Sequence, residues 1–324
     1  MKNRESKLVA VVVGAGKMGA FYDGPTSTEI FSHAHAFLRN PDTTLLGFVD
    51  PDAQARKKAA ELWNARPFST LEEAFSSGPV DLVSVAVPDH LHAQVLQETL
   101  RYSPKAILLE KPVASSLEQA RQIRSLLSRN PVPVLLNYSR RFDSSCQQLR
   151  ARIWRNELGK FQGGVGTYCK GLFHNGSHLV DLCRFLLGEV CGTLGVERKL
   201  GFSASDPSVS GMLFFPGNAV VFLQGLEHRH YWVFELDLFF EKGRVRFEDS
   251  GFSIQNFLVK SHPLFPESTD IFPGQKEETG LGSALENAVR NLVGCAQGKE
   301  KPLCSVEDGV RVLEICQQMK DSLP

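Results

Sequence analysis

Lys111 has the surroundings of a lysine that does chemistry. It follows residues 106–109, an apolar run that predicts a buried strand, and it stands between Glu110 and Pro112. Open α/β sheets bind their ligands at the carboxyl ends of their strands. Because proline disfavours the helical conformation in the residue before it, Lys111 should be extended. We therefore expect Lys111 to contact a ligand, with Glu110 holding it by charge; the alternative is an exposed lysine at a strand end.

His178 is the candidate acid or base. Ser177 is expected to cap a helix over residues 179–187, where apolar side chains recur at helical spacing, and Gly188 suits the end of that helix. The positive end of the helix dipole disfavours imidazolium, so His178 should stay neutral and able to accept a proton. Asp181 would orient it. The alternatives are a packed histidine at a helix start and a structural aspartate.

A glycine-rich turn follows the first apolar run, residues 8–13. A strand followed by such a turn and a helix is typical of a βαβ unit that binds a dinucleotide. The glycines let the backbone approach a pyrophosphate, and free N–H groups at the start of the helix bind it. The residues expected to contact the cofactor in this turn are Gly14, Gly16, Lys17, Met18 and Gly19.

Asp50 ends the second expected strand, residues 44–50. A carboxylate there accepts hydrogen bonds from ribose hydroxyls and repels a 2′-phosphate, which favours NAD over NADP. Asp50 stands 31 residues after Gly19, whereas the general pattern has about 20. We assign the excess to an insertion, residues 21–32, ahead of a helix at 33–39. The insertion would either cover the active site or form a plain surface excursion.

The N-terminal half of the chain alternates expected strands and helices. This alternation predicts a parallel, doubly wound sheet, which defines a Rossmann-like α/β fold. The strands are expected at residues 8–13, 44–50, 80–87, 106–109 and 132–137. The helices are expected at residues 33–39, 53–63, 71–75, 91–100 and 117–127.

The C-terminal half predicts an α+β domain with a mostly antiparallel sheet. Residues 261–282 carry several prolines and are expected to form a surface loop. We expect an NAD-binding domain at residues 1–137 and a domain for substrate binding and oligomerisation at residues 138–324. The expected strands are residues 161–170, 209–215, 219–227, 231–240, 244–248 and 252–260, and two closing helices lie near 284–296 and 306–319.

Composition and charge narrow the class of protein. The 324 residues carry a formal net charge of zero, so no nucleic acid and no anionic membrane is expected as a partner. No apolar stretch approaches the roughly 20 residues of a membrane span, and the N-terminus does not resemble a signal peptide. The seven cysteines are scattered, which is typical of reduced thiols in the cytoplasm. The basic and aromatic segment 228–232 is expected in a substrate-side loop or at a sheet edge.

Six segments, in their order and spacing, resemble the Gfo/Idh/MocA family of oxidoreductases, named for glucose–fructose oxidoreductase and inositol dehydrogenase. The resemblance covers nearly the whole chain. It implies an NAD(P)-dependent enzyme that transfers hydride to or from a sugar, a nucleotide-linked sugar or a cyclic polyol, and Asp50 favours NAD as its cofactor. The broad second sheet would suit a homodimer or homotetramer. The matching segments are 14–19, 49–52, 87–92, 110–112, 141–142 and 176–181.

The resemblance also implies roles for single residues. Lys111, His178 and His174 would be catalytic, removing a hydroxyl proton as hydride leaves the adjacent carbon. Many family members have an aspartate where this chain has His174, so a fixed negative charge is missing here. The residues expected to bind substrate are Lys111, Arg141, His174, Asn175, His178 and Asp181. Beyond the turn and Asp50, those expected to bind the cofactor are Val87, Pro88, His92, Glu110, Lys111 and Asn137.

Several alternatives stay open. His174, His178 and Asp181 are types of residue that bind metals, but His174 precedes the expected helix and hydride transfer needs no metal, so we expect none. His174 and His92 would otherwise be structural, and Arg141 would form a surface ion pair. The whole protein would otherwise be a non-catalytic NAD(H) sensor of the same fold, or a reductase of a different carbonyl or imine substrate.

Overall fold

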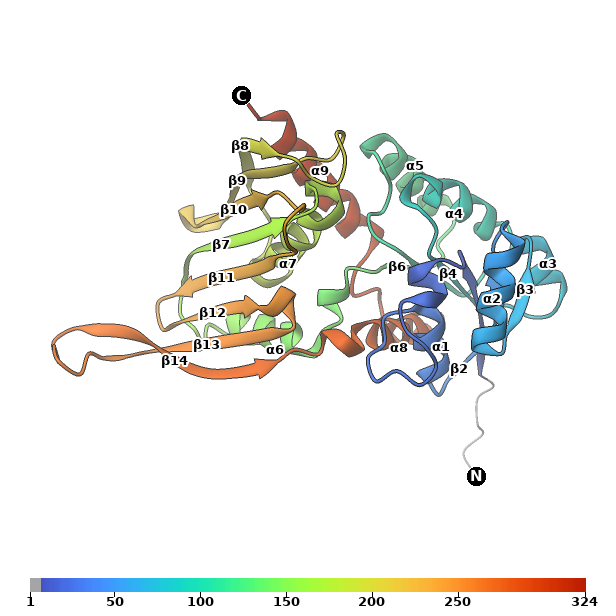
Figure 1. The fold of residues 1–324 in the computed structure, drawn as a ribbon, viewed down its shortest axis with the longest axis horizontal. Helices are drawn as coiled ribbons and strands as arrows, with labels where there is room; N and C mark the ends of the chain where they lie inside the picture. The colour runs from blue at the N-terminus through green and yellow to red at the C-terminus, as the bar shows by residue number, and fades with distance from the viewer. Residues whose placement is uncertain (1–6) are drawn as a thin grey trace. The chain divides into compact units, whose positions relative to one another are not determined.

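The computed structural model describes residues 7–324, and the chain divides into two compact units (Figure 1). Unit 1 comprises the chain up to Phe142 together with Gly282–Val310. Unit 2 comprises Asp143–Leu281 together with Arg311–Pro324. Each unit is built on one sheet. The roles expected for the two parts of the chain, cofactor binding and substrate binding, stay predictions.

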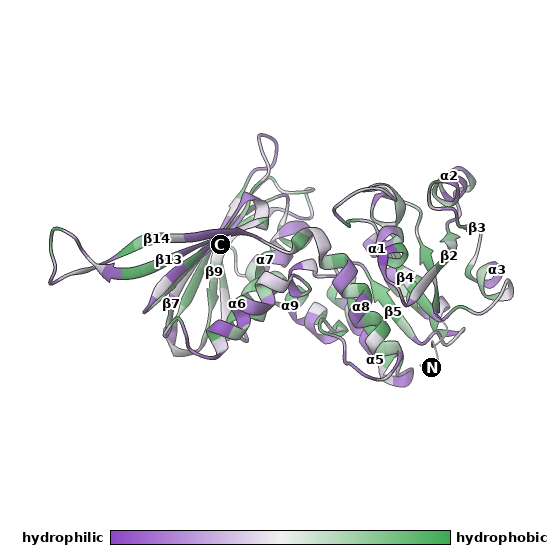
Figure 2. Cartoon of the chain, turned by 90° about the horizontal axis from the view of Figure 1, so that it is seen from below, coloured by the Kyte–Doolittle hydropathy of each residue, from purple (hydrophilic) through white to green (hydrophobic). Residues whose placement is uncertain are grey.

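Unit 1 contains a six-stranded parallel sheet in the order β3-β2-β1-β4-β5-β6. This confirms the expected doubly wound α/β fold. The strand order reverses between β1 and β4, and sheets of this kind bind ligands beyond the carboxyl ends of the strands at that point. Figure 2 shows β4 and β5 as largely hydrophobic, which suits central strands buried on both faces. The strands are β1 (Leu8–Val13), β2 (Thr43–Val49), β3 (Arg66–Phe68), β4 (Leu82–Val85), β5 (Ala106–Leu109) and β6 (Val134–Leu136).

Helices α1 to α5 and α8 accompany this sheet. Side chains of Ser32, Asp52, Thr70 and Ser116 accept hydrogen bonds from backbone N–H groups at the starts of α1, α2, α3 and α5. Caps of this type satisfy donors that have no partner within the helix. α8 packs against α1 and β5, although unit 2 separates them in the sequence. The helices are α1 (His33–Arg39), α2 (Ala53–Trp63), α3 (Leu71–Ser76), α4 (His92–Leu100), α5 (Leu117–Arg129) and α8 (Ala284–Ala296).

Unit 2 contains an eight-stranded sheet in the order β14-β13-β12-β11-β7-β10-β9-β8. β7 and β10 are parallel and the other neighbours are antiparallel, so the expected mostly antiparallel sheet is confirmed. The strands are β7 (Phe161–Cys169), β8 (Gly192–Lys199), β9 (Ser208–Phe214), β10 (Val220–Leu226), β11 (Phe234–Phe240), β12 (Gly243–Glu248), β13 (Ser253–Ser261) and β14 (Thr269–Glu278).

Helices α6 (Ser144–Trp154) and α7 (Ser177–Leu187) pack against each other, and α7 also contacts β7. The contact with β7 is close because of Gly166, where an added Cβ would lie 2.6 Å from the Leu179 side chain. Helix α9 (Val306–Asp321) begins in unit 1 and ends in unit 2. No helix within the described residues combines the length and the hydropathy needed to cross a membrane.

The expectation of a surface loop over residues 261–282 is wrong. Residues 269–278 of this segment form β14, which pairs with β13 in the long hairpin of Figure 1. The prolines suggested a loop because proline breaks interior strands. Proline is tolerated, however, on an edge strand. β14 is such an edge strand, and Pro273 lies at a register shift in its pairing with β13.

Candidate active site

The glycine turn after β1 has the shape that a pyrophosphate needs. Gly14 has φ +100°, and an added Cβ there would lie 2.6 Å from the carbonyl oxygen of Ala86. A Cβ on Gly19 would lie 1.9 Å from the carbonyl oxygen of Gly14. A Cβ on Gly16 would meet no atom of residues 7–324 within 4 Å. Two glycines therefore shape the turn, and the third leaves open space that fits the pyrophosphate of a dinucleotide.

The segment after the turn is a short π-helix, η1 (Lys17–Phe21), so Lys17 and Met18 both lie in its first turn. The indole nitrogen of Trp63 donates a hydrogen bond to the carbonyl of Ala20 at 2.8 Å. This bond ties η1 to α2. Only this short helical segment follows the glycines directly. Helix α1 begins after the insertion, at residues 33–39, where a helix was expected.

Asp23 organises the insertion at residues 21–32. Its carboxylate accepts hydrogen bonds from the backbone N–H groups of Phe31 at 2.6 Å and Ser32 at 3.2 Å, and it lies 3.0 Å from Nδ1 of His35. Burial alone would raise the pKa of Asp23, but the hydrogen bonds from Ser32, Phe31 and His35 outweigh burial and lower it. These hydrogen bonds give the insertion a defined conformation within unit 1. Its role over an active site stays a prediction.

Asp50 lies beside the glycine turn, as the sequence pattern suggests. One carboxylate oxygen accepts a hydrogen bond from the Ala15 N–H at 2.8 Å, and the other accepts one from the Asp52 N–H at 2.9 Å. Arg56 donates to the backbone carbonyls of Asp50 and Pro51 at 3.2 and 3.0 Å. Because each carboxylate oxygen has two lone pairs, Asp50 keeps acceptor capacity for ribose hydroxyls.

Glu110 is the centre of a buried network at the carboxyl ends of β4, β5 and β6. Its Oε1 lies 2.8 Å from Nε2 of His33 and accepts a hydrogen bond from Nδ2 of Asn137 at 2.6 Å. Nδ1 of His33 is hydrogen-bonded to the hydroxyl of Ser84. His33 is completely buried and Glu110 is 6% exposed. The network therefore fixes the residue directly before Lys111.

The electrostatics of this network keep Glu110 ionised. Burial raises the pKa of Glu110, but hydrogen bonding and charge from His33, together with Asn137 and Lys111, more than offset burial and lower the pKa. Oδ1 of Asn137 is buried and has no hydrogen-bond partner among the described residues. A buried acceptor without a partner at the end of β6 fits a ligand amide, such as the carboxamide of a nicotinamide.

His92 ties together the segments that follow β4 and β5. Its Nδ1 lies 2.9 Å from the carbonyl oxygen of Pro112, and its Nε2 lies 3.0 Å from that of Val87. Burial lowers the pKa of His92 despite these carbonyls. Pro88 precedes a short 3₁₀ turn, η2 (Asp89–Leu91). These contacts favour the structural alternative for His92, and direct contact of Val87, Pro88 and His92 with a cofactor stays a prediction.

Lys111 leaves the carboxyl end of β5 and is partly exposed. Its backbone N–H lies 3.3 Å from Oε2 of Glu110, and its peptide bond to Pro112 is cis. Asn137 follows β6, the neighbouring strand. Unit 1 therefore brings the predicted residues Glu110, Lys111 and Asn137 together at adjacent strand ends.

His174 and His178 lie on one continuous helical run. His174 precedes α7, as expected, but the π-helical segment η4 (Leu172–Gly176) that carries it leads directly into α7. Ser177 is not the cap: its hydroxyl donates to the carbonyl of Phe173 at 2.7 Å. The positive end of the run is therefore at Leu172, one turn before the position that the sequence suggested.

Asp206 caps this run in place of Ser177. Its carboxylate accepts hydrogen bonds from the N–H groups of Phe173 at 2.8 Å and His174 at 2.9 Å. Burial raises the pKa of Asp206, although hydrogen bonds from Phe173, His174 and Leu172 oppose this rise. Sequence analysis missed Asp206 because it lies 33 positions from Phe173.

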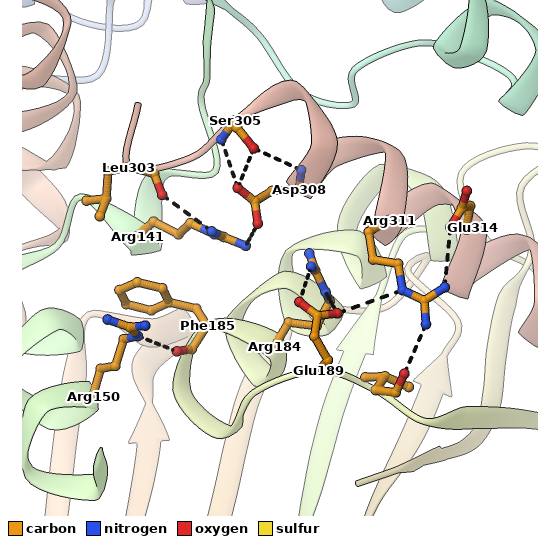
Figure 3. Close-up of polar contacts among 11 residues, drawn as sticks. Arg141, Arg150, Arg184, Phe185, Glu189, Leu303, Ser305, Asp308, Arg311 and Glu314 are labelled. Carbon is orange, nitrogen blue, oxygen red and sulfur yellow. Dashed lines mark hydrogen bonds and ion pairs between the residues drawn. The ribbon is translucent and has the colours of Figure 1, made fainter. Parts of the chain in front are cut away.

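Two further predicted substrate residues lie on the same run. Asn175 is buried, and its amide nitrogen donates to the carbonyl of Cys169 at 2.9 Å. Asp181 is 1% exposed. Figure 3 shows Arg184 of α7 paired with Glu189 at 2.6 Å. Unit 2 therefore brings the predicted His174, Asn175, His178 and Asp181 onto one helical run that polar contacts anchor.

Arg141 has structural partners within unit 1. Its guanidinium lies 3.1 Å from Asp308 of α9 and donates to the carbonyl of Leu303 at 3.4 Å (Figure 3). The Arg141 side chain is 8% exposed. This favours the ion-pair alternative, in a buried rather than a surface form. Binding of a substrate anion by Arg141 stays a prediction.

The fold and the glycine turn define a class of protein, the α/β proteins that bind a dinucleotide at the carboxyl ends of a parallel sheet. Residues 8–138 match the model of one family in that class, described as "Oxidoreductase family, NAD-binding Rossmann fold". Over these residues the chain is similar to the Gfo/Idh/MocA family, and the resemblance expected from the motifs is confirmed.

Two relatives illustrate the match in sequence. Inositol 2-dehydrogenase of Corynebacterium glutamicum strain R is 32% identical over 151 residues, which are 46% of this chain and 42% of that protein. The scyllo-inositol 2-dehydrogenase (NAD(+)) of Bacillus subtilis strain 168 is 25% identical over 216 residues, which are 60% of this chain and 59% of that protein. The chain thus spans about half the length of the curated relatives that it matches.

A solved structure extends the likeness to both units. Levoglucosan dehydrogenase in complex with NADH and L-sorbose has a TM-score of 0.80 at 16% identity, and the match covers 98% of this chain and 96% of that chain. At this identity the likeness shows the fold alone. Within the described residues, no cluster of three or more His, Cys, Asp or Glu side chains is arranged to hold a metal ion.

Proposed function

We propose that this protein is an NAD-dependent dehydrogenase that oxidises a secondary hydroxyl of a sugar or cyclic polyol. The observation that carries the proposal is the position of Lys111. It follows a buried, ionised Glu110 at the carboxyl end of β5, in a unit that matches an NAD-binding Rossmann fold. Relatives that are inositol dehydrogenases support the class of substrate.

NAD is favoured over NADP by the geometry around Asp50. Its carboxylate is held beside the glycine turn by the Ala15 and Asp52 N–H groups. A fixed negative charge at this place accepts the ribose hydroxyls and repels a 2′-phosphate. Arg56 is the residue that would work against this preference, because it lies close to the same backbone.

The bound nicotinamide supplies the hydride acceptor, and the side chains of this chain supply position and proton transfer. Lys111 binds the oxygen of the reacting hydroxyl and orients its carbon. In unit 2, His178 and His174 share one helical run and stay the predicted acid–base residues of that unit. The amide of Asn175 ties that run to the end of β7, and Asp181 is buried on the same run.

The proposal is tested by NADH formation at 340 nm with a panel of inositols, sugars and nucleotide sugars. The Lys111→Met variant should lose about 10²- to 10⁴-fold in kcat/KM, the usual contribution of a group that assists proton transfer. Lys105→Met is the matched control. Lys105 lies just before the amino end of β5 and pairs with Asp81 at 2.8 Å, so its loss should leave turnover near that of the wild type.

The same assay separates the other candidate functions. NAD+ binding without turnover on any alcohol of the panel would contradict the proposal and favour a sensor. NADH consumption with a carbonyl or imine, and no alcohol oxidation, would favour a reductase of another substrate class. Equal turnover of Lys111→Met and Lys105→Met would remove Lys111 from the mechanism.

We also propose that the protein self-associates through one face of the unit 2 sheet. Cross-strand neighbours place Leu194, Met212, Phe222 and Val165 in one row across β8, β9, β10 and β7. Phe222 is 50% exposed, and Val165 is 42% exposed. An apolar row of this kind is typical of an interface.

Light scattering should show that the wild-type protein is a dimer or tetramer and that the Phe222→Asp variant is a monomer. A monomeric wild type would contradict this proposal.

A further inference from the structure

The end of β7 presents a lysine over two aromatic rings. Lys170 follows β7 directly, and both Lys170 and Gly171 have positive φ, +70° and +86°. Nζ of Lys170 lies 5.0 Å from the ring centre of Trp232 and 5.8 Å from that of Phe202. These are distances at which a cation is attracted to an aromatic face. The left-handed backbone therefore turns Lys170 toward rings from two separate loops.

Both rings are held by contacts within unit 2. Phe202 stacks on His174 with 4.1 Å between ring centres and 4° between the planes. The residues on either side of Trp232 are tied to Cys169, because the Val233 N–H lies 3.4 Å from its Sγ and the Tyr231 carbonyl lies 3.6 Å away. Phe202 and Trp232 nevertheless remain 53% and 51% exposed. We call Lys170, Phe202 and Trp232 the Lys170 cluster.

Within residues 7–324, no carboxylate forms an ion pair with Lys170. The positive charge of the Lys170 cluster therefore has no negative partner there. Two neighbouring acids are engaged elsewhere. The carboxylate of Asp206 accepts hydrogen bonds from the backbone N–H groups of Phe173 and His174. Glu227, which begins the loop that carries Trp232, pairs with Arg229. One positive charge therefore remains beside two half-exposed aromatic residues.

We propose that the Lys170 cluster is a substrate subsite for a sugar ring that carries a carboxylate. The rings offer rigid apolar faces that match the C–H face of a sugar, and the ammonium group offers a charged hydrogen bond to a carboxylate. A single lysine matches a single negative charge. A diphosphate carries more charge and is usually held by arginine forks.

The place of the Lys170 cluster in the sequence of elements supports this assignment. His174 belongs to the helical run that carries His178, and its ring forms the stack with Phe202. A sugar held on these rings is therefore held beside a residue predicted to take part in catalysis. The inference rests on the proposed dehydrogenase function and names the chemical class of its substrate.

The test is calorimetric titration of the NAD+-saturated protein with matched pairs of sugars. The pairs are D-glucose with D-glucuronate and D-galactose with D-galacturonate. The wild type should bind the acidic member of at least one pair about tenfold more tightly, the usual gain from a hydrogen bond to a charged group. Lys170→Met should bring this ratio close to one.

Lys320→Met is the matched control. Lys320 also lies over an aromatic ring of unit 2, with Nζ 5.5 Å from the ring centre of Phe173, but it donates to the carbonyl of Ser205 at 2.8 Å. This variant removes the same charge and should keep the preference for the acidic sugar. Trp232→Leu should weaken both members of a pair alike, because it removes a ring face and no charge.

The outcomes separate this inference from the proposed function. An acid preference that depends on Lys170, without any NADH formation, would support the subsite and contradict the dehydrogenase. NADH formation from neutral sugars, with no acid preference in either pair, would contradict the subsite and leave the dehydrogenase standing. An acid preference that Lys170→Met retains, or that Lys320→Met abolishes, would also overturn the subsite.

Discussion

The Glu110 network of unit 1 and the Lys170 cluster of unit 2 are held in opposite ways. In unit 1, Glu110 and His33 are buried and joined by short hydrogen bonds. In unit 2, Phe202 and Trp232 are about half exposed and are held by stacking and by contacts of their neighbours. A buried hydrogen-bonded network fixes one geometry, whereas exposed rings on loops tolerate change.

This difference matches the demands on the two regions. A dinucleotide has a constant shape, so a rigid site that fits it does not need to vary between relatives. Sugars and polyols differ in hydroxyl positions and in charge, so specificity is best carried by loops such as those that hold Phe202 and Trp232. Four predictions, from the largest expected effect to the smallest, test this contrast.

Removal of His33 should be the most damaging change. The His33→Ala variant leaves the buried Glu110 carboxylate without its histidine partner, and loss of a hydrogen-bond partner to a buried charged group costs about 1–3 kcal/mol or more in the free energy of unfolding. Urea denaturation measures this loss. His90→Ala is the control, because the His90 side chain is 64% exposed and its loss should change stability little. A loss below about 1 kcal/mol for His33→Ala would contradict the buried network.

The same network predicts a dependence of stability on pH. The pKa of Glu110 is lower in the folded state than its ordinary value of 4.5. A carboxyl group with a lowered pKa stabilises the fold above its unfolded pKa, and this contribution is lost as pH falls through the folded pKa. Acid titration below pH 4.5 should therefore destabilise the wild type more steeply than Glu110→Gln. Parallel curves would contradict the assignment.

Two glycines of the turn should respond differently to alanine. Gly16→Ala adds a methyl group to open space at an ordinary φ of −88°, so it should fold normally and lose about tenfold or more in NAD+ affinity. Gly19→Ala drives a Cβ toward the Gly14 carbonyl and should lower the melting temperature. Calorimetry and thermal unfolding separate the two effects. Unchanged NAD+ affinity in Gly16→Ala would place the pyrophosphate elsewhere.

Asp206 should show the smallest effect. Asp206→Ala removes the acceptor for the Phe173 and His174 N–H groups and should lower stability by about 1 kcal/mol, as loss of a helix cap does. Asp206→Asn keeps an acceptor. Burial raises the pKa of Asp206 in the folded state. Its protonated carboxyl group therefore stabilises the fold fully below the unfolded pKa, and this stabilisation is lost as pH rises through the folded pKa. The Phe173 and His174 N–H groups bond to different carboxylate oxygens, so Asp206→Asn keeps one acceptor and should lose less stability than Asp206→Ala in thermal unfolding at neutral pH; an equal or larger loss would contradict this.

The same contrast explains how much of the molecule could be predicted from sequence. Buried parallel strands are continuous apolar runs, and the run at 106–109 was found as β5. The positions of Asp50 beside the glycine turn and of Glu110 before Lys111 follow from local motifs. The hydrogen bond between His33 and Glu110 joins residues 77 positions apart, so no local sequence pattern predicts it.

In unit 2 the failures have similar causes. β8 and β14 are edge strands with exposed residues, so they lack the apolar signal of a buried strand. Ser177 has the side chain of a cap, but the helical run begins five residues earlier and takes its cap from distant Asp206. The Lys170 cluster joins three separate segments of the chain and has no linear motif.

The claim that unit 1 presents a preformed NAD site is tested most directly by calorimetric titration of the wild-type protein with NAD+ and with NADP+. The account predicts that NAD+ binds at least about tenfold more tightly, because the fixed carboxylate of Asp50 accepts the ribose hydroxyls and repels a 2′-phosphate. Equal affinity would mean that Arg56 accommodates the phosphate, and absence of NAD+ binding would contradict the account as a whole.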